Sequence, residues 1–130
     1  TNTEWKEIKF VLELNSKEPI YLQIIAYMKK RIVSGELKGG ERILSVREYA
    51  SEIKVNPNTI QKVYSELENQ NLIYTQRGIG KFVTEDENTV NNLRQELFNE
   101  AIDKFMEESR VLGFTKDKII AIISERYLEE

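Results

Sequence analysis

The chain contains no cysteine and no histidine among its 130 residues. Their absence excludes disulfide bonds, thiolate zinc sites, cysteine nucleophiles, histidine general bases and histidine metal ligands. Long hydrophobic runs are also missing, since the longest uncharged stretch is Pro19–Met28, too short to span a membrane. No signal-peptide pattern opens the chain. We therefore expect a cytoplasmic protein that is not an enzyme, does not associate with membranes and uses no cofactor or metal ion.

Charge is unevenly distributed along the chain, whose net charge is −3. Residues 17–84 contain 11 Lys and Arg against 7 Glu, a net charge of +4. Residues 85–130 contain 6 basic against 12 acidic side chains, a net charge of −6, and residues 1–16 carry −1. A basic middle followed by an acidic end predicts one region that faces a polyanion and another with a different partner.

Hydrophobic periodicity predicts a short strand over residues 8–14 in an N-terminal segment, 1–16, followed by three helices. In the first helix, from residue 20, the apolar stripe is Tyr21, Ile24, Ile25, Met28 and Ile32. Ser45 and Glu48 have the spacing of a capping box and begin the second helix. Asn56 before Pro57 is typical of an N-cap and begins the third, whose buried face is Ile60, Val63, Tyr64 and Leu67.

Two β-like runs, Leu72–Gln76 and Lys81–Thr84, flank a glycine-containing segment, 77–80. Because glycine adopts positive φ easily, this segment predicts a β-hairpin with a basic tip. Two helices joined by a short turn and followed by a hairpin have the order of a winged helix-turn-helix. Residues 17–84 are therefore predicted to be a mainly α DNA-binding domain with a small β-hairpin.

Residues 85–130 predict a helical tail. A long helix from Asn88 to about Leu112 ends before Gly113, and Thr115 can cap a final helix. Two helices of this length cannot close a core of their own, so their apolar faces must pack on the winged domain or on a second copy. Four helices from two chains would bury these faces well, which favours a homodimer. An apolar groove in the dimer is where a small-molecule effector would bind.

A winged helix reads DNA with the exposed N-terminal residues of its second helix-turn-helix helix, which enter the major groove. Asn and Gln bind adenine, Thr and Lys reach bases or phosphate, and a wing arginine enters the minor groove. An arginine in the first turn of the preceding helix opposes the helix dipole and suggests an anionic partner. The candidate DNA-binding residues are Arg47, Asn56, Asn58, Thr59, Gln61, Lys62, Arg77, Gly78 and Lys81.

Each candidate has a simpler interpretation. The polar side chains of residues 58–62 also suit an ordinary solvated helix face, and Arg47 could pair with Glu48 or Glu52. Arg77 could be a solubilising turn charge. The basic run 29–31 is interpreted as a solvated helix face, with phosphate contact as the alternative.

Three motifs, Ile43–Ala50, Val55–Tyr64 and Arg77–Val83, resemble the GntR family of bacterial transcription regulators. The two-helix tail is similar to the YtrA-type subgroup, whose members dimerise through it. The resemblance implies a dimeric repressor of a near-palindromic operator, often beside membrane-transporter genes. It also implies DNA contacts from the residues that match the family's contacts, namely Arg47, Asn58, Thr59, Gln61, Arg77 and Gly78. Leu44 stands where the family usually has proline, and Pro57 and Gln61 stand where many relatives have arginine.

The alternative function is a protein-interaction adaptor that uses the winged fold and the apolar tail without binding DNA. The net charge of residues 17–84 and the position of Arg77 favour DNA instead.

Overall fold

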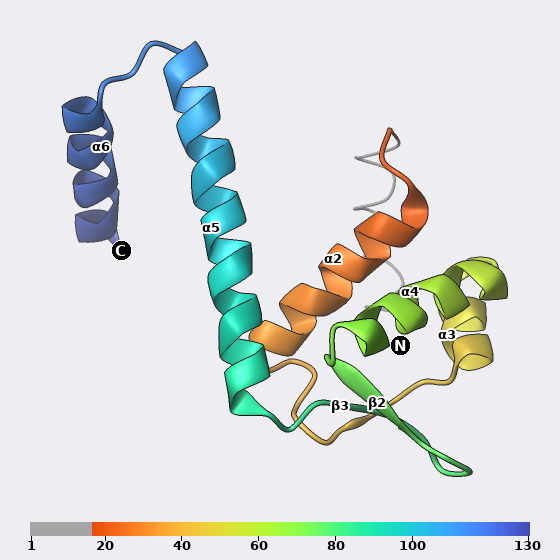
Figure 1. The fold of residues 1–130 in the computed structure, drawn as a ribbon. Coiled ribbons are helices and arrows are strands. Elements are labelled where there is room, and N and C mark those ends of the chain that lie inside the picture. Colours follow the sequence, from red (N-terminus) through yellow and green to blue (C-terminus); the bar gives the residue numbers. More distant parts are fainter. Residues whose placement is uncertain (1–16) are drawn as a thin grey trace. The chain divides into compact units, whose positions relative to one another are not determined.

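The computed structural model describes residues 17–130 (Figure 1). The strand expected over residues 8–14 lies outside the described residues. The chain forms two compact units, of which the first ends at Leu93 and the second comprises Arg94–Glu130.

Helix α2 (Ile20–Val33) opens the described part of the first unit and has the apolar face that its periodicity predicts. The carbonyl of Pro19 accepts the first hydrogen bonds, from the backbone N–H groups of Leu22 and Gln23. Gly35 follows the end of the helix with φ of +81°, a left-handed conformation that favours glycine at this position. The side chains that α2 buries are Gln23, Ile24, Ile25, Met28 and Ile32, whereas Tyr21 is half-buried.

Helices α3 (Val46–Ile53) and α4 (Pro57–Asn69) form the predicted helix-turn-helix. The capping box at α3 is complete, because Ser45 Oγ accepts from the Glu48 backbone at 3.2 Å and Glu48 Oε1 accepts from the Ser45 backbone at 3.0 Å. Asn56 Oδ1 caps α4 by accepting from the Asn58 N–H at 2.8 Å. Lys54 ends α3 in a left-handed conformation, φ 57°, that the sequence did not indicate. The buried face of α4 is Ile60, Val63, Tyr64 and Leu67, as predicted.

Strands β2 (Ile73–Gln76) and β3 (Gly80–Val83) form the predicted antiparallel hairpin, which we call the wing. A third strand, β1 (Arg42–Ile43), pairs with β3 on its other side and gives the sheet order β1-β3-β2. The sequence prediction missed β1, so the hairpin is in fact part of a three-stranded sheet. Two residues are too few to show an alternating pattern, and their partner strand lies far along the chain.

The core of the first unit lies where α2, α3, α4 and the inner face of the sheet meet (Figure 1). Tyr64 is the largest fully buried side chain, and its hydroxyl donates to the Leu44 carbonyl at 2.7 Å. Its ring stacks on that of Tyr49 with centroids 6.2 Å apart. This contact fixes the loop before α3 against α4, so the two helices of the motif are held together by a buried polar link as well as by apolar packing.

Helix α5 (Glu87–Val111) starts in the first unit, where Leu93 is buried, and continues into the second. Gly113 follows with φ of +80°, and Thr115 Oγ1 caps helix α6 (Lys116–Glu129) by accepting from the Lys118 N–H at 3.3 Å. Helix α6 buries none of its side chains within the chain. The large apolar side chains that this unit leaves exposed are Phe98, Ile102, Phe105, Met106, Val111, Leu112, Phe114, Ile120, Ile123, Tyr127 and Leu128.

Candidate nucleic-acid interface

The N-terminal half of α4 presents polar side chains on the face opposite its buried stripe. Asn58, Gln61 and Lys62 are exposed and Thr59 is half-buried. Gln61 Nε2 donates to Ser65 Oγ at 3.2 Å, a weak exposed contact that leaves the amide oxygen available. Four neighbouring side chains therefore offer donors and acceptors of the kind that read base edges.

Two of the predicted residues at this helix are partly engaged within the protein. Asn56 uses Oδ1 for the helix cap, which leaves its amide group as a donor. Lys62 Nζ lies 3.7 Å from the centroid of the Tyr21 ring, a cation–π contact between α4 and α2. The ammonium group of Lys62 is therefore held toward α2 by an aromatic face.

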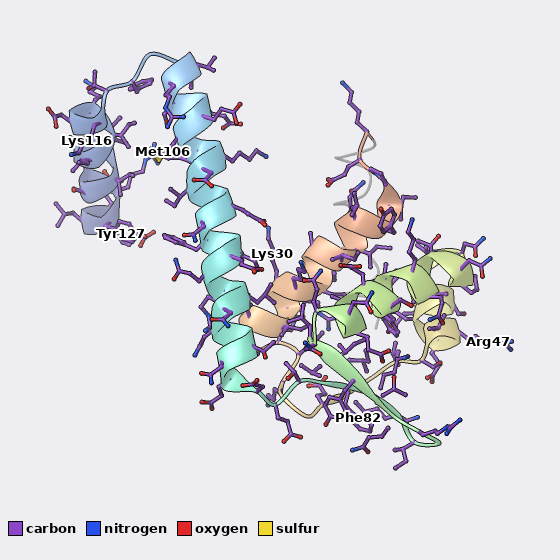
Figure 2. All side chains as sticks on the ribbon, viewed as in Figure 1. Lys30, Arg47, Phe82, Met106, Lys116 and Tyr127 are labelled. Carbon is purple, nitrogen blue, oxygen red and sulfur yellow. The ribbon has the colours of Figure 1, made fainter. Side chains whose placement is uncertain are left out.

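Arg47 lies in the first turn of α3 and extends away from the helix (Figure 2). The alternative considered above, a salt bridge from Arg47 to Glu48 or Glu52, is absent within residues 17–130. The Arg47 side chain is instead exposed. Glu48 is instead occupied by the capping box, and hydrogen bonds from the backbone and side chain of Ser45 lower its pKa. The guanidinium group of Arg47 is therefore unpaired among the described residues. It lies at the N-terminus of α3, where the helix dipole does not stabilise a positive charge.

The tip of the wing presents a second exposed cation. Arg77 is exposed, and Gly78 follows in the positive-φ conformation, 79°, that the turn requires. The Ile79 N–H donates to the Gln76 carbonyl at 2.9 Å and closes the turn, while 59% of the Ile79 side chain remains exposed. An arginine and an isoleucine thus project from a tight turn, a shape suited to the narrow minor groove.

Lys81 does not face outward like Arg77. Its Nζ lies 3.2 Å from Glu68 Oε1 and 2.8 Å from Thr75 Oγ1, and the Thr75 hydroxyl itself donates to Glu68. The hydrogen bond from Thr75, and then the hydrogen bond and the positive charge of Lys81, hold the pKa of Glu68 below its usual value. The cation of Lys81 is therefore neutralised against α4.

Sequence reasoning overlooked Arg42, although the structure places it in the same region. Arg42 is exposed on β1 and lines a groove together with Ser45 and Val46 at the start of α3 and the wing residues Gly78–Lys81. A basic residue three positions before the predicted N-cap, Ser45, was the available signal. The groove brings the start of α3 and the wing into one continuous surface.

No cluster of three or more acidic side chains that could hold a metal ion occurs within residues 17–130. Across the same residues, no helix combines the length and hydropathy that a membrane span requires.

A helix-turn-helix with an exposed polar recognition face, a free arginine before it and a basic wing after it defines a winged-helix transcription regulator. The chain matches the gntR family of bacterial regulatory proteins over residues 20–83, a range that holds all nine candidate residues. The protein belongs to the GntR family.

Known relatives agree with this assignment. The HTH-type transcriptional repressor YtrA of Bacillus subtilis is 34% identical over 115 residues, which cover 88% of this chain and 88% of the repressor. The structure of a GntR family transcriptional regulator from Listeria monocytogenes matches with a TM-score of 0.78 and 42% identity, covering 84% of this chain and 96% of that one. The DNA-binding domain of AraR, solved in complex with an operator, matches with a TM-score of 0.50 and 27% identity over 54% of this chain and 84% of that one.

Proposed function

We propose that this protein is a homodimeric repressor that binds a near-palindromic operator through its two winged domains. The observation that carries the proposal is the presence of free polar or cationic side chains on three elements: Arg47 on α3, the exposed face of α4, and Arg77 on the wing. Each element has a distinct place on DNA in a winged helix, at the backbone, the major groove and the minor groove.

The proposal gives the residues different tasks. Asn58, Thr59 and Gln61 read base edges in the major groove, since their side chains are exposed at the start of α4. Arg47 contacts a phosphate and Arg77 the minor groove, and the backbone of Gly78 allows close approach there. The remaining candidates, Asn56, Lys62 and Lys81, support these contacts and add positive charge nearby.

Dimerisation is proposed to occur through α5 and α6. Phe98, Ile102, Phe105 and Met106 recur at the spacing of one face of α5, and all four are at least 39% exposed. Ile120, Ile123 and Tyr127 form a second exposed apolar stripe on α6, and Figure 2 labels Met106 and Tyr127 on the two helices. A second copy supplies the same stripes, and a four-helix arrangement would remove them from water.

The regulated genes are proposed to include a membrane transporter, as the resemblance to the YtrA-type subgroup implies. The B. subtilis relative is named a transcriptional repressor, and the same direction of regulation is proposed for this protein. A chromosomal operator would place the action of the protein in the cytoplasm, and the proposal assigns no catalytic step to it.

Fluorescence anisotropy of the protein with the DNA upstream of its own gene tests the proposal, with an unrelated duplex as the control. We expect a preference of about a thousandfold or more for the upstream DNA, and an affinity that falls steeply with salt. Equal, salt-sensitive binding to both duplexes would reject the operator proposed here. Absence of binding to either duplex at low salt would favour the adaptor function instead.

A further inference from the structure

The guanidinium group of Arg42 lies against the backbone of the wing. Gly80 has no side chain, and a Cβ atom at this position would lie 2.8 Å from Arg42 Nε and 3.4 Å from both Cζ and Nη2. A methyl group there would displace Arg42, so the absence of a side chain at residue 80 makes room for the arginine. The φ of Gly80, +153°, also belongs to the region that side chains rarely adopt.

Arg42 also acts on the start of α3. The Ser45 hydrogen bonds lower the pKa of Glu48 most, and the positive charge of Arg42 lowers it further. The guanidinium group is therefore within electrostatic reach of the capping box. Arg47 lies in the same first turn, so Arg42 stands between the helix start that carries one free arginine and the hairpin that carries the other, Arg77.

The inner face of the sheet is connected to α4. Arg42 pairs with Phe82 and Ile43 pairs with Lys81, and successive residues of a strand point to opposite faces. Lys81 is bound to Glu68 of α4 on the inner face, while Arg42 lies on the outer one. The wing is thus ion-paired to α4 through Lys81 on one face, and on the other face Arg42 lies between the wing and the start of α3.

We propose that Arg42 is a positioning residue for DNA binding, which holds the wing so that Arg77 and Arg47 contact the same duplex. This inference rests on the proposed function. The tip of the wing lies beyond the β1–β3 pairs and the Lys81–Glu68 ion pair, so it can still bend and twist, and ordering it on DNA would cost entropy. A contact that orders the wing in the free protein removes part of this cost.

The geometry explains why the residue is arginine. A flat guanidinium group can lie across a glycine Cα and still direct its charge toward Glu48, whereas a lysine ammonium is a compact, strongly hydrated point charge. Arg42→Lys therefore keeps the charge and loses the planar contact. This variant separates a positioning role from a simple phosphate contact, which either cation could make.

A double-mutant cycle tests the proposal. Affinity for a labelled duplex from upstream of the gene is measured for the wild type, Arg42→Ala, Arg77→Ala and the double variant. Each single variant is expected to bind about tenfold more weakly, and the double variant no more weakly than Arg77→Ala alone, because Arg42 acts through the wing. Losses that multiply to about a hundredfold would show an independent phosphate contact and overturn the proposal.

Two further variants serve as a control for lost surface charge and as a test of the planar contact. Lys30→Ala removes one exposed charge from α2 and serves as the matched control, with an affinity expected to stay within about twofold of the wild type. Arg42→Lys is expected to bind as weakly as Arg42→Ala. Wild-type affinity in Arg42→Lys, or in Arg42→Ala itself, would refute a positioning role.

Amide hydrogen exchange of the free protein judges the positioning role without DNA. In Arg42→Ala the Ile79 N–H and its wing neighbours should exchange several-fold faster, while buried amides of α2 keep their wild-type rates and report an intact fold. Unchanged exchange in the wing would overturn the inference even if DNA binding is weakened. If the wild type binds no duplex at all, the proposed function fails, and the exchange rates still decide whether Arg42 fastens the wing.

Discussion

Arg47 and Arg77 differ from the other basic residues of the interface in what surrounds their charges. Lys62 lies over the Tyr21 ring and Lys81 is bound to Glu68, whereas neither arginine has an ionic or aromatic partner among residues 17–130. A free cation gains most from a phosphate, because it gives up no internal partner on binding. We therefore expect substitutions of the arginines to affect DNA binding more strongly than substitutions of the lysines.

Arg47→Ala should weaken binding to the upstream duplex and to an unrelated duplex alike, by about tenfold, and reduce the salt dependence by about one phosphate contact. Gln61→Ala offers the contrast, because loss of a base contact should mainly relax the preference at one base pair. Anisotropy titrations at several salt concentrations measure both effects. An unchanged affinity for Arg47→Ala would contradict its assignment to the DNA backbone.

Tyr64→Phe tests the buried link between α4 and the loop before α3. Removing the hydroxyl leaves the Leu44 carbonyl without its donor at 2.7 Å, and we expect a loss of about 1 kcal/mol in the free energy of unfolding. Urea unfolding followed by circular dichroism measures this. Tyr74→Phe is the matched control, since the Tyr74 hydroxyl makes only a long, exposed contact with Glu85 at 3.4 Å. Equal stability of Tyr64→Phe and the wild type would show that the link contributes nothing.

Within the winged domain, helices α3 and α4 are specified by local contacts. Each begins at a side chain that accepts a backbone N–H within three residues, Ser45 for α3 and Asn56 for α4. Both helix starts belong to the interface, so the same caps that define the helices also fix where Arg47 and Asn58 stand. Loss of a cap should therefore affect binding as well as stability.

Glu48→Gln tests the capping box through its pH dependence. Hydrogen bonds from Ser45 put the folded-state pKa of Glu48 below its ordinary value of 4.5. The ionised carboxylate therefore stabilises the fold above the ordinary value, and this contribution disappears as the pH falls through the lowered folded-state value. The wild type should be more stable than Glu48→Gln at neutral pH, and the difference should close in acid. Urea midpoints across the pH range measure it, and a pH-independent difference would argue against this origin.

On the scale of the whole molecule, charge and apolar exposure are separated along the chain. Residues 17–84 carry +4 and contain every candidate DNA contact, while residues 85–130 carry −6 and expose most of the large apolar side chains. An acidic tail is repelled by DNA, so its exposed apolar side chains remain available to pack against a second copy of the chain. This separation fits one region for the operator and another for dimerisation.

Phe105→Asp should dissociate the proposed dimer into monomers, because a charge would be buried in the proposed four-helix interface. Sedimentation equilibrium measures the association state, and Phe105→Leu serves as the control because it keeps an apolar side chain at the same position. The monomer should bind the upstream DNA at least a hundredfold more weakly, since it engages a single half-site. A Phe105→Asp variant that remains dimeric would place the interface elsewhere.

The helices, their caps, the hairpin turn and the buried faces were predictable from the sequence, because each depends on hydrogen bonds or periodicity within a few residues. Ser45 with Glu48, Asn56 before Pro57, and the glycines at 78 and 113 act this way. The exposed positions of Arg47 and Arg77 followed from the same local patterns.

Which basic side chains keep an unpaired charge depends on contacts between segments that are distant in the sequence. Lys81 binds Glu68, which lies 13 residues earlier in the chain. Arg42 approaches Gly80 because β1 pairs with β3, and a strand of two residues is too short to predict this pairing from sequence. These contacts form when distant segments pack on one core, and the local sequence of each segment does not indicate them. The family of the protein and its winged helix-turn-helix fold were thus predictable from the sequence, whereas the contacts of Lys81 and Arg42 depend on packing between distant segments.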